Sequence, residues 1–189
     1  MDALLNLAAV RLCTESEGPG KRFALWVQGC LQHCPGCCNQ QMQKIETAHI
    51  IAIRDVISLI EKAKKTFEIE GVSFIGGEPL LQAKGLAEIA FWCRQNNLSV
   101  LCFTGFSYEN LVTSDDQYVQ LLLKNTDILV DGLYDEKSPD TDRDWVGSKN
   151  QKVIFLSNRY KHGIEYEKKE RCMEFLISES EILSNGWPF

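Results

Sequence analysis

Four of the eight cysteines in this 189-residue chain lie close together, between Cys30 and Cys38. The chain is 44% hydrophobic and 24% charged, which is ordinary for a globular protein of a size that can bury a core without disulfides. Disulfide scaffolds spread their cysteines through short, loop-rich secreted chains, so one tight group of thiols indicates a metal site instead.

Three of these cysteines, Cys30, Cys34 and Cys37, have the spacing C-x3-C-x2-C. Clusters that only carry electrons usually take four cysteines, so three thiolates would leave one iron of a 4Fe–4S cluster open to a substrate. The alternative is a zinc site with Cys38 or His33 as the fourth ligand. Structural zinc usually draws on two separated ligand pairs, and this sequence lacks a second pair.

Buried strands and amphipathic helices alternate through the middle of the chain, which predicts βα units and a parallel sheet. The helical spacing covers Ile53 to Ile60, Leu86 to Cys93, and Tyr118–Lys124. Cys93 lies on the apolar face of one of these helices, and Cys102 lies on the apolar face of a strand. Both are expected to pack as small hydrophobic residues. Strands are predicted at Asn6–Cys13, Phe23–Val27, Gly71–Ile75, Ser99–Thr104, Ile128–Asp131 and Lys152–Leu156.

The chain is expected to form one domain over residues 1–189, with a core at about 6–156 and a C-terminal extension at 157–189. The extension should carry a short strand pair, Met173–Ile177 and Glu181–Leu183. Closed barrels of eight units take about 250 residues. We therefore expect an α/β fold of the incomplete (β/α)6 type, a partial barrel with parallel strands that is open on one side.

The motifs resemble those of the radical S-adenosylmethionine (SAM) superfamily, and within it the activating enzymes of glycyl radical enzymes. The resemblance rests on Gly18–Arg22, Gln28–Cys30, the cysteine spacing and Gly76–Pro79 (Gly-Gly-Glu-Pro), which occur in that family's order. Cys34-Pro-Gly-Cys37 looks most like the activators of the anaerobic (class III) ribonucleotide reductase.

Two further segments, Asp127–Gly132 and Gly147–Gln151, resemble those activators, so the likeness runs from about Val10 to Leu156. Cys38 departs from their pattern, because an aromatic residue commonly follows the third cysteine there. The chain also continues beyond Leu156.

The resemblance implies a 4Fe–4S cluster on Cys30, Cys34 and Cys37, with SAM bound at the open iron. Cleavage of SAM to a 5′-deoxyadenosyl radical is the cofactor's chemistry, so no general acid or base is expected. Gly76, Gly77 and Glu78 should meet the methionine amino group, although Gly-Gly-Glu-Pro could also be a plain strand-to-helix turn.

Other candidates for SAM contact lie nearby in the predicted sheet. The backbone of Gly36 and Cys38 could reach the adenine, and Thr104 and Asp131 end neighbouring strands and could reach the ribose or the amino acid part. Asn39 is a weaker candidate. Capped turns explain such single polar residues equally well.

The implied activity is formation of a glycyl radical on a partner enzyme, with an electron donor such as flavodoxin or ferredoxin, under anaerobic conditions. A small molecule, nucleoside or peptide substrate is the second hypothesis, and a non-catalytic zinc or iron–sulfur module is the third. Trp145 is either a partner contact or ordinary packing. Gly147–Gln151 either shapes the substrate opening or forms a turn.

The net charge of −6 argues against nucleic acid or anionic membranes as partners. The sequence has no apolar run of membrane-spanning length and no signal-peptide pattern at its start. A cytoplasmic location is therefore expected.

Overall fold

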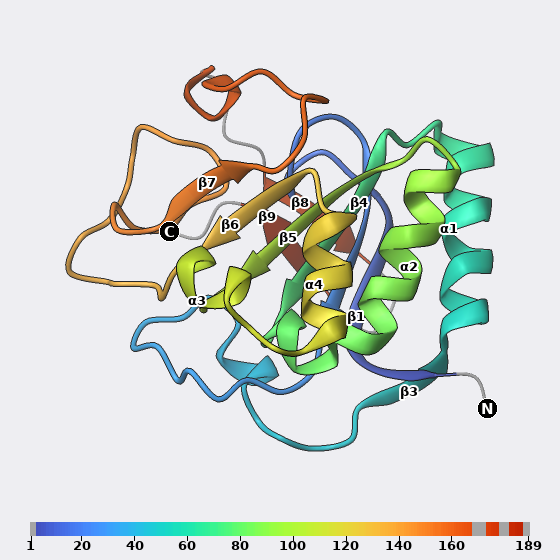
Figure 1. The fold of residues 1–189 in the computed structure, drawn as a ribbon, viewed down its shortest axis with the longest axis horizontal. Coiled ribbons are helices and arrows are strands. Elements are labelled where there is room, and N and C mark those ends of the chain that lie inside the picture. Colours follow the sequence, from blue (N-terminus) through green and yellow to red (C-terminus); the bar gives the residue numbers. More distant parts are fainter. Residues whose placement is uncertain (1–2, 168–172, 178–181, 187–189) are drawn as a thin grey trace.

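The computed structural model describes residues 3–167, 173–177 and 182–186 (Figure 1). Its largest element is a seven-stranded mixed sheet in the order β3-β1-β2-β4-β5-β6-β7. The strands are β1 (Leu4–Thr14), β2 (Arg22–Val27), β3 (His49–Ala52), β4 (Gly71–Gly76), β5 (Ser99–Thr104), β6 (Ile128–Asp131) and β7 (Lys152–Phe155), and a separate hairpin consists of β8 (Met173–Ile177) and β9 (Ile182–Gly186).

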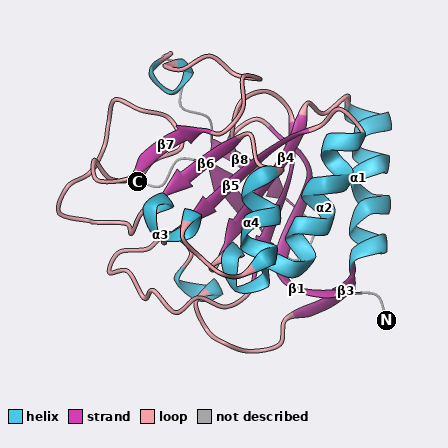
Figure 2. Cartoon of the chain, viewed as in Figure 1, coloured by secondary structure: helices cyan, strands magenta, loops and turns pink. Residues whose placement is uncertain are grey.

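Within the described residues, four helices and three short 3-10 turns connect the strands. Figure 1 shows α1, α2 and α4 on one face of the sheet, and Figure 2 shows long loops around the edges of the sheet, beside β7 and below the strands. The helices are α1 (Ile53–Phe67), α2 (Ala83–Gln95), α3 (Tyr108–Val112) and α4 (Gln117–Lys124), and the turns are η1 (Gln40–Met42), η2 (Pro79–Gln82) and η3 (Ile164–Tyr166). None of the helices in the described ranges has the length and apolar character that a membrane crossing requires.

The α/β class is confirmed, but the partial barrel of about six units is not. Only β2, β4, β5 and β6 run parallel, joined by three helical crossovers. β1 and β3 at one edge and β7 at the other are antiparallel to their neighbours. The reason for β1 is local: the connection to β2 is a short turn, and parallel strands need a crossover of a dozen residues or more.

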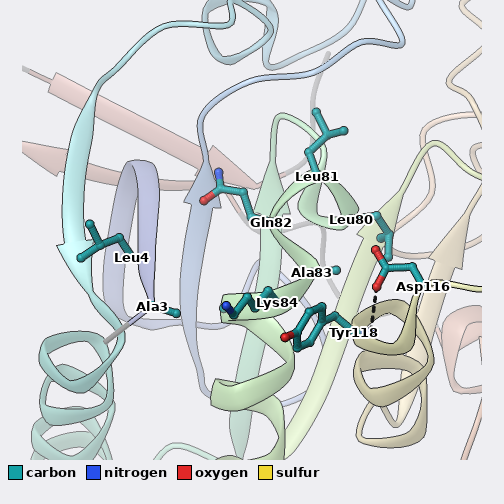
Figure 3. A pocket seen from close by; sticks show the side chains of 10 residues that line it. Ala3, Leu4, Leu80, Leu81, Gln82, Ala83, Lys84, Asp116 and Tyr118 are labelled. Carbon is teal, nitrogen blue, oxygen red and sulfur yellow. Dashed lines mark hydrogen bonds between the residues drawn. The ribbon is translucent and has the colours of Figure 1, made fainter. Parts of the chain in front are cut away.

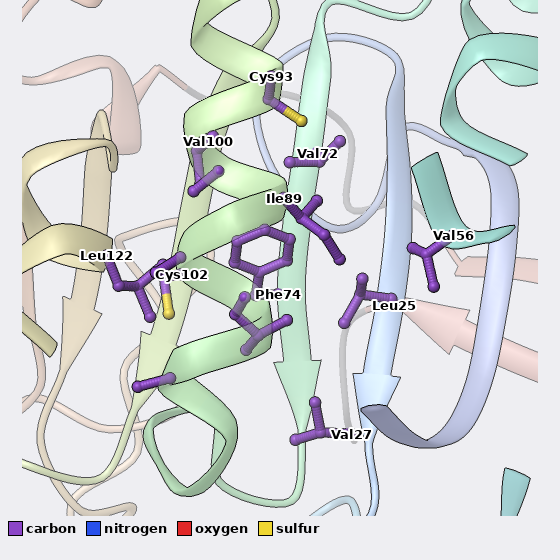
Figure 4. Packing of buried hydrophobic residues seen from close by; sticks show 14 of the residues in the cluster. Leu25, Val27, Val56, Val72, Phe74, Ile89, Cys93, Val100, Cys102 and Leu122 are labelled. Carbon is purple, nitrogen blue, oxygen red and sulfur yellow. The ribbon is translucent and has the colours of Figure 1, made fainter. Parts of the chain in front are cut away.

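Alternation along the parallel strands builds the main core between sheet and helices. Leu25, Phe74 and Val100 are fully buried on the helix-covered face, as Figure 4 shows. Cys93 on α2 and Cys102 on β5 are buried in the same cluster, so the expectation that they pack as small hydrophobes is confirmed.

At the amino ends of the parallel strands, a fully buried arginine ties three segments together. Arg22 Nε donates to Ser73 Oγ at 2.7 Å, and Nη1 donates to Ser99 Oγ at 3.0 Å and to the Pro19 carbonyl at 3.1 Å. Nη1 also reaches the hydroxyl of Tyr160 at 3.4 Å. Burial lowers the pKa of Arg22, and the neutral acceptors take the place of the water that it has lost.

The C-terminal hairpin β8–β9 contacts the turn between β1 and β2. Asn185 Nδ2 donates to Ser16 Oγ at 2.7 Å, the Glu15 amide donates to Glu174 Oε1 at 2.8 Å, and the Gly186 amide donates to Glu17 Oε1 at 3.0 Å. The predicted strand Met173–Ile177 is confirmed, whereas its partner is Ile182–Gly186, and Glu181 lies outside the described residues.

Candidate functional site

The cysteine loop leaves the carboxyl end of β2 and is held at its base by main-chain hydrogen bonds. The Gly29 amide donates to the Met42 carbonyl at 2.8 Å, and the Cys30 amide donates to the Gln43 carbonyl at 2.9 Å. These two bonds close the loop, so residues 31–41 project from the edge of the sheet where sites form in α/β folds.

The Gly-Gly-Glu-Pro turn at the end of β4 is hydrogen-bonded to the start of this loop. The Gly77 amide donates to the Val27 carbonyl at 2.8 Å, and the Glu78 amide donates to the Gly29 carbonyl at 2.8 Å. The two motifs singled out from the sequence are therefore neighbours in space.

Both glycines of that turn are required by close backbone approach. A Cβ on Gly76, whose φ is +107°, would lie 2.5 Å from the Val27 nitrogen, and a Cβ on Gly77 would lie 2.2 Å from the Gly29 carbonyl oxygen. Larger residues cannot enter without separating the turn from the cysteine loop. The expected contact of Gly76 and Gly77 with SAM stays a prediction.

The three predicted ligand thiols differ in exposure and in acidity. Cys30 is buried, Cys34 and Cys37 are half-buried, and all three are free thiols. Burial raises the pKa of Cys30. A hydrogen bond between the Cys38 and Cys37 side chains lowers the pKa of Cys37 to about 6 and raises that of Cys38. The Cys37 thiol therefore ionises more readily than the Cys30 thiol.

Backbone amides point at two of these sulfurs. The Gln32 amide donates to Cys30 Sγ and the Asn39 amide donates to Cys37 Sγ, each at 3.4 Å. Such hydrogen bonds stabilise thiolates and tune iron–sulfur clusters. Over the described ranges no three Cys, His, Asp or Glu side chains are grouped as a metal-binding set. The donor chemistry fits a cluster, and the ligand set itself stays a prediction.

Glu78 is buried, and its carboxylate is engaged by the protein. Oε1 accepts hydrogen bonds from Thr104 Oγ1 and the Leu80 amide, both at 2.9 Å, and Oε2 accepts from the Gly105 amide at 2.8 Å. Burial raises the pKa of Glu78, and the three hydrogen bonds oppose that rise. In this arrangement Glu78 braces the loop after β5, a role that the sequence analysis did not anticipate.

Thr104 and Asp131 brace the same loop. Both are buried; Thr104 Oγ1 accepts from the Phe106 amide at 3.1 Å, and Asp131 Oδ2 accepts from the Tyr108 amide at 2.7 Å. Strand order brings them to one edge as expected, but the hydrogen bonds are those of capped turns. Their contact with SAM stays a prediction.

Gly36 in the cysteine loop lies against the segment that follows β6. Its φ is +70°, and an added Cβ would lie 2.6 Å from Glu136 Oε2 and 3.3 Å from Tyr134 Cε1. Tyr134 and Glu136 were not predicted as neighbours of the cysteines. The available signal was their position, directly after a strand that ends at this edge.

The segment Gly147–Gln151 is a hydrogen-bonded turn. Gln151 Oε1 accepts from the Gly147 amide at 2.8 Å and from the Ser148 amide at 3.1 Å. Trp145 is half-buried and packs against a cluster that contains Leu101 and Val130, which supports the packing alternative for this tryptophan.

A pocket of about 380 Å³ lies elsewhere, on the helix side of the structure (Figure 3). Lys84 and Tyr118 form part of its wall, with Lys84 Nζ 5.5 Å from the centre of the Tyr118 ring. None of the predicted site residues lines this pocket, so we place the candidate site at the cysteine loop.

Comparisons with known proteins show the family of this chain. A family model described as a 4Fe-4S single cluster domain matches residues 16–154. The chain is 27% identical over 153 residues to the anaerobic ribonucleoside-triphosphate reductase-activating protein of Enterobacteria phage T4, covering 79% of this chain and 93% of the relative.

Two more relatives have similar identity. The anaerobic ribonucleoside-triphosphate reductase-activating protein of Vibrio cholerae is 30% identical over 142 residues, covering 72% of this chain and 89% of the relative. The pyruvate formate-lyase-activating enzyme of Staphylococcus aureus is 31% identical over 141 residues, covering 73% of this chain and 55% of the relative.

The chain belongs to the 4Fe–4S single-cluster domain family. It is an enzyme of the radical SAM class, similar to activators of glycyl radical enzymes, and its cofactors are a 4Fe–4S cluster and SAM. The interpretations as a zinc site or a non-catalytic module are thereby set aside.

Proposed function

We propose that this enzyme places a glycyl radical on a partner enzyme, and that the partner is an anaerobic ribonucleotide reductase. The named relatives support the class of partner. The observation that carries the proposal is the pair of main-chain hydrogen bonds that join the Gly-Gly-Glu-Pro turn to the base of the cysteine loop. If the cysteines hold the cluster and the turn binds SAM, this arrangement would bring the cluster and the amino acid part of SAM together.

In this proposal Cys30, Cys34 and Cys37 hold the cluster, and the backbone of Gly76 and Gly77 receives the methionine amino group. When bound and reduced, the cluster would supply the one-electron chemistry for reductive cleavage of SAM, and this chemistry would remove a hydrogen atom from the partner. Glu78, Thr104 and Asp131 fix the loop after β5. The Gly36 and Cys38 backbone then faces the adenine, and Glu78 contacts SAM directly only if its present hydrogen bonds rearrange.

The proposal also covers the shape of the fold, the C-terminal extension, the electron donor and the location in the cell. The sheet would act as an incomplete barrel, and its open side would admit the glycine-bearing segment of the partner. Residues 157–189 would form an extension of a single radical SAM domain. A flavodoxin or ferredoxin in the cytoplasm would supply the electron. Nucleic acid and membranes would not be partners, which the net charge of −6 supports.

The test uses the full chain, reconstituted anaerobically with iron and sulfide, reduced, and supplied with SAM. We expect 5′-deoxyadenosine from the wild type and none from Cys34→Ala. Cys13→Ala is the matched control, because Cys13 is a half-buried free thiol on β1, outside the cysteine loop. Uptake of zinc without 5′-deoxyadenosine would contradict the proposal.

A second stage tests the partner. A purified class III reductase is added, and electron paramagnetic resonance (EPR) is used to look for a glycyl radical doublet. Production of 5′-deoxyadenosine without a doublet would retain the radical chemistry and refute this partner.

A further inference from the structure

The ring of Tyr134 lies between two glycines that come from different loops. A Cβ on Gly147 would lie 2.9 Å from Cδ2 and Cε2 of the ring, whereas a Cβ on Gly36 would lie 3.3 Å from Cε1. Cε1 and the Cδ2–Cε2 edge are on opposite sides of a tyrosine ring. The two glycines therefore form the walls of a slot, and the ring occupies it.

One wall of the slot is part of the cluster loop itself. Gly36 stands between Cys34 and Cys37, in a turn closed by a hydrogen bond from the Cys37 amide to the Cys34 carbonyl at 3.3 Å. The conformation of this turn decides how far apart the two thiols lie. A ring that packs on Gly36 therefore affects the distance between the Cys34 and Cys37 thiols, which are two of the predicted ligands.

The other side of the slot, the turn Gly147–Gln151, is hydrogen-bonded to the segment that follows β6. Gln151 Nε2 donates to the Gly132 carbonyl at 3.1 Å, Asn150 Nδ2 donates to the Leu133 carbonyl at 2.7 Å, and the Asp135 amide donates to Ser148 Oγ at 3.1 Å. These bonds fix the backbone on both sides of Tyr134. The ring thus links a braced segment to a loop that projects from the edge.

We propose that Tyr134 is a positioning residue for the cluster: its ring, held between Gly36 and Gly147, sets the Cys34–Cys37 turn and with it the iron that is open to SAM. The proposal rests on cluster binding by Cys30, Cys34 and Cys37. Tyr134 acts through Gly36 and has no part in bond breaking.

Three variants test this role, each reconstituted as the full-length holoenzyme. In Tyr134→Ala we expect the EPR signal of the reduced cluster to change less on addition of SAM, and SAM affinity by equilibrium dialysis to fall about 10-fold, the usual size of a supporting-residue effect. Tyr134→Phe keeps the ring and should restore both readouts. Tyr166→Ala removes a ring that is 57% exposed and serves as the control.

Gly147→Ala moves the ring instead of removing it. Gly147 has no positive φ, so its backbone accepts alanine, but the new Cβ would lie 2.9 Å from the ring. We expect a smaller loss of SAM affinity than in Tyr134→Ala. In the double variant the ring is absent, so the effect of Gly147→Ala should vanish; this non-additivity is what coupled neighbours show.

The outcomes separate this proposal from the proposed function. Wild-type enzyme that forms no 5′-deoxyadenosine refutes both. If the wild type is active but Tyr134→Ala matches it in SAM affinity and EPR signal, only the role of Tyr134 is refuted. Independent, additive effects of the two substitutions would also refute it. If Tyr134→Ala fails to fold by circular dichroism, Gly147→Ala and Tyr134→Phe decide the question.

Discussion

The two ends of the parallel strands bury different sets of charged groups. At the amino ends these are the cation Arg22 and the carboxylate of Asp127, and at the carboxyl ends they are the carboxylates of Glu78 and Asp131. Helices begin at the carboxyl ends, and their first amides lack partners within the helix. Leu80 and Tyr108, in the first turns of η2 and α3, donate to these carboxylates.

Around Arg22 the hydrogen-bond acceptors are carbonyl and hydroxyl oxygens, which suit a donor-rich guanidinium. Arg22 accordingly uses its donors on neighbouring segments. The comparison teaches that the amino ends are devoted to stability. At the carboxyl ends the carboxylates brace the loops and leave the cysteine thiols free for a cofactor.

Replacing Arg22 by Met should have the largest effect on stability. The substitution leaves Ser73 Oγ, Ser99 Oγ and the Pro19 carbonyl without their donor in a buried site. We expect the free energy of unfolding to fall by about 3–5 kcal/mol, because several buried acceptors lose a hydrogen bond and each unsatisfied group costs about 1–3 kcal/mol. Urea unfolding measures it; a change below about 1 kcal/mol would show that the amino ends do not depend on this residue.

Replacing Glu78 by Gln should cost about 1–3 kcal/mol, because glutamine has one acceptor oxygen where the carboxylate has two. Either the Gly105 amide or the pair formed by Thr104 and Leu80 then loses its acceptor. The loop after β5 should loosen, so hydrogen exchange at residues 105–108 should accelerate. Unchanged exchange there would contradict the bracing role.

The smallest expected effect concerns Glu17 at the amino ends. Burial raises its pKa to about 7 from an ordinary value of 4.5, with Glu174 of β8 adding to the rise and hydrogen bonds from Gly186 and Asn185, together with Arg11, opposing it. The folded state then binds the proton more tightly than the unfolded state does. Stability from this group is therefore present below about pH 4.5 and is lost as the pH rises to about 7.

We expect this loss to be about 1 kcal/mol, since Glu17 keeps some contact with water. It should appear as faster proteolysis of the β8–β9 hairpin at pH 7 than at pH 5. Glu17→Gln should flatten the pH profile. A profile with the same slope in the variant would assign the pH dependence to another group.

Much of this arrangement could be predicted from local sequence. Apolar runs with turn signals predicted β2, β4 and β5 to within about a residue, and the Gly-Gly-Glu-Pro motif was placed correctly beside the cysteines. β3 was missed, since His49 and Ile50 are exposed and the segment has no alternating pattern. The antiparallel edges were missed because periodicity does not reveal strand direction; for β1 and β2 the short connecting turn was the signal that could have shown it.

The site was predictable in position and less so in side-chain direction. Topology alone brings Thr104 and Asp131 to one edge. Whether they face a ligand or the protein depends on nearby amides, such as those of Phe106 and Tyr108, whose orientation is set by the folded loop. Tyr134 was missed for a similar reason: its neighbours, Gly36 and Gly147, are distant in sequence and carry no side chain that would mark the contact.

The coupling between the cysteine loop and the Gly-Gly-Glu-Pro turn has one more consequence. It runs through main-chain amides and carbonyls of Val27, Gly29, Gly77 and Glu78, so it does not depend on the identity of side chains farther along the loop. Leu31, which is 63% exposed, can therefore be substituted without disturbing these main-chain hydrogen bonds. Substitutions on the exposed part of the cysteine loop can therefore change the surface that meets other proteins without changing the backbone contacts of the site.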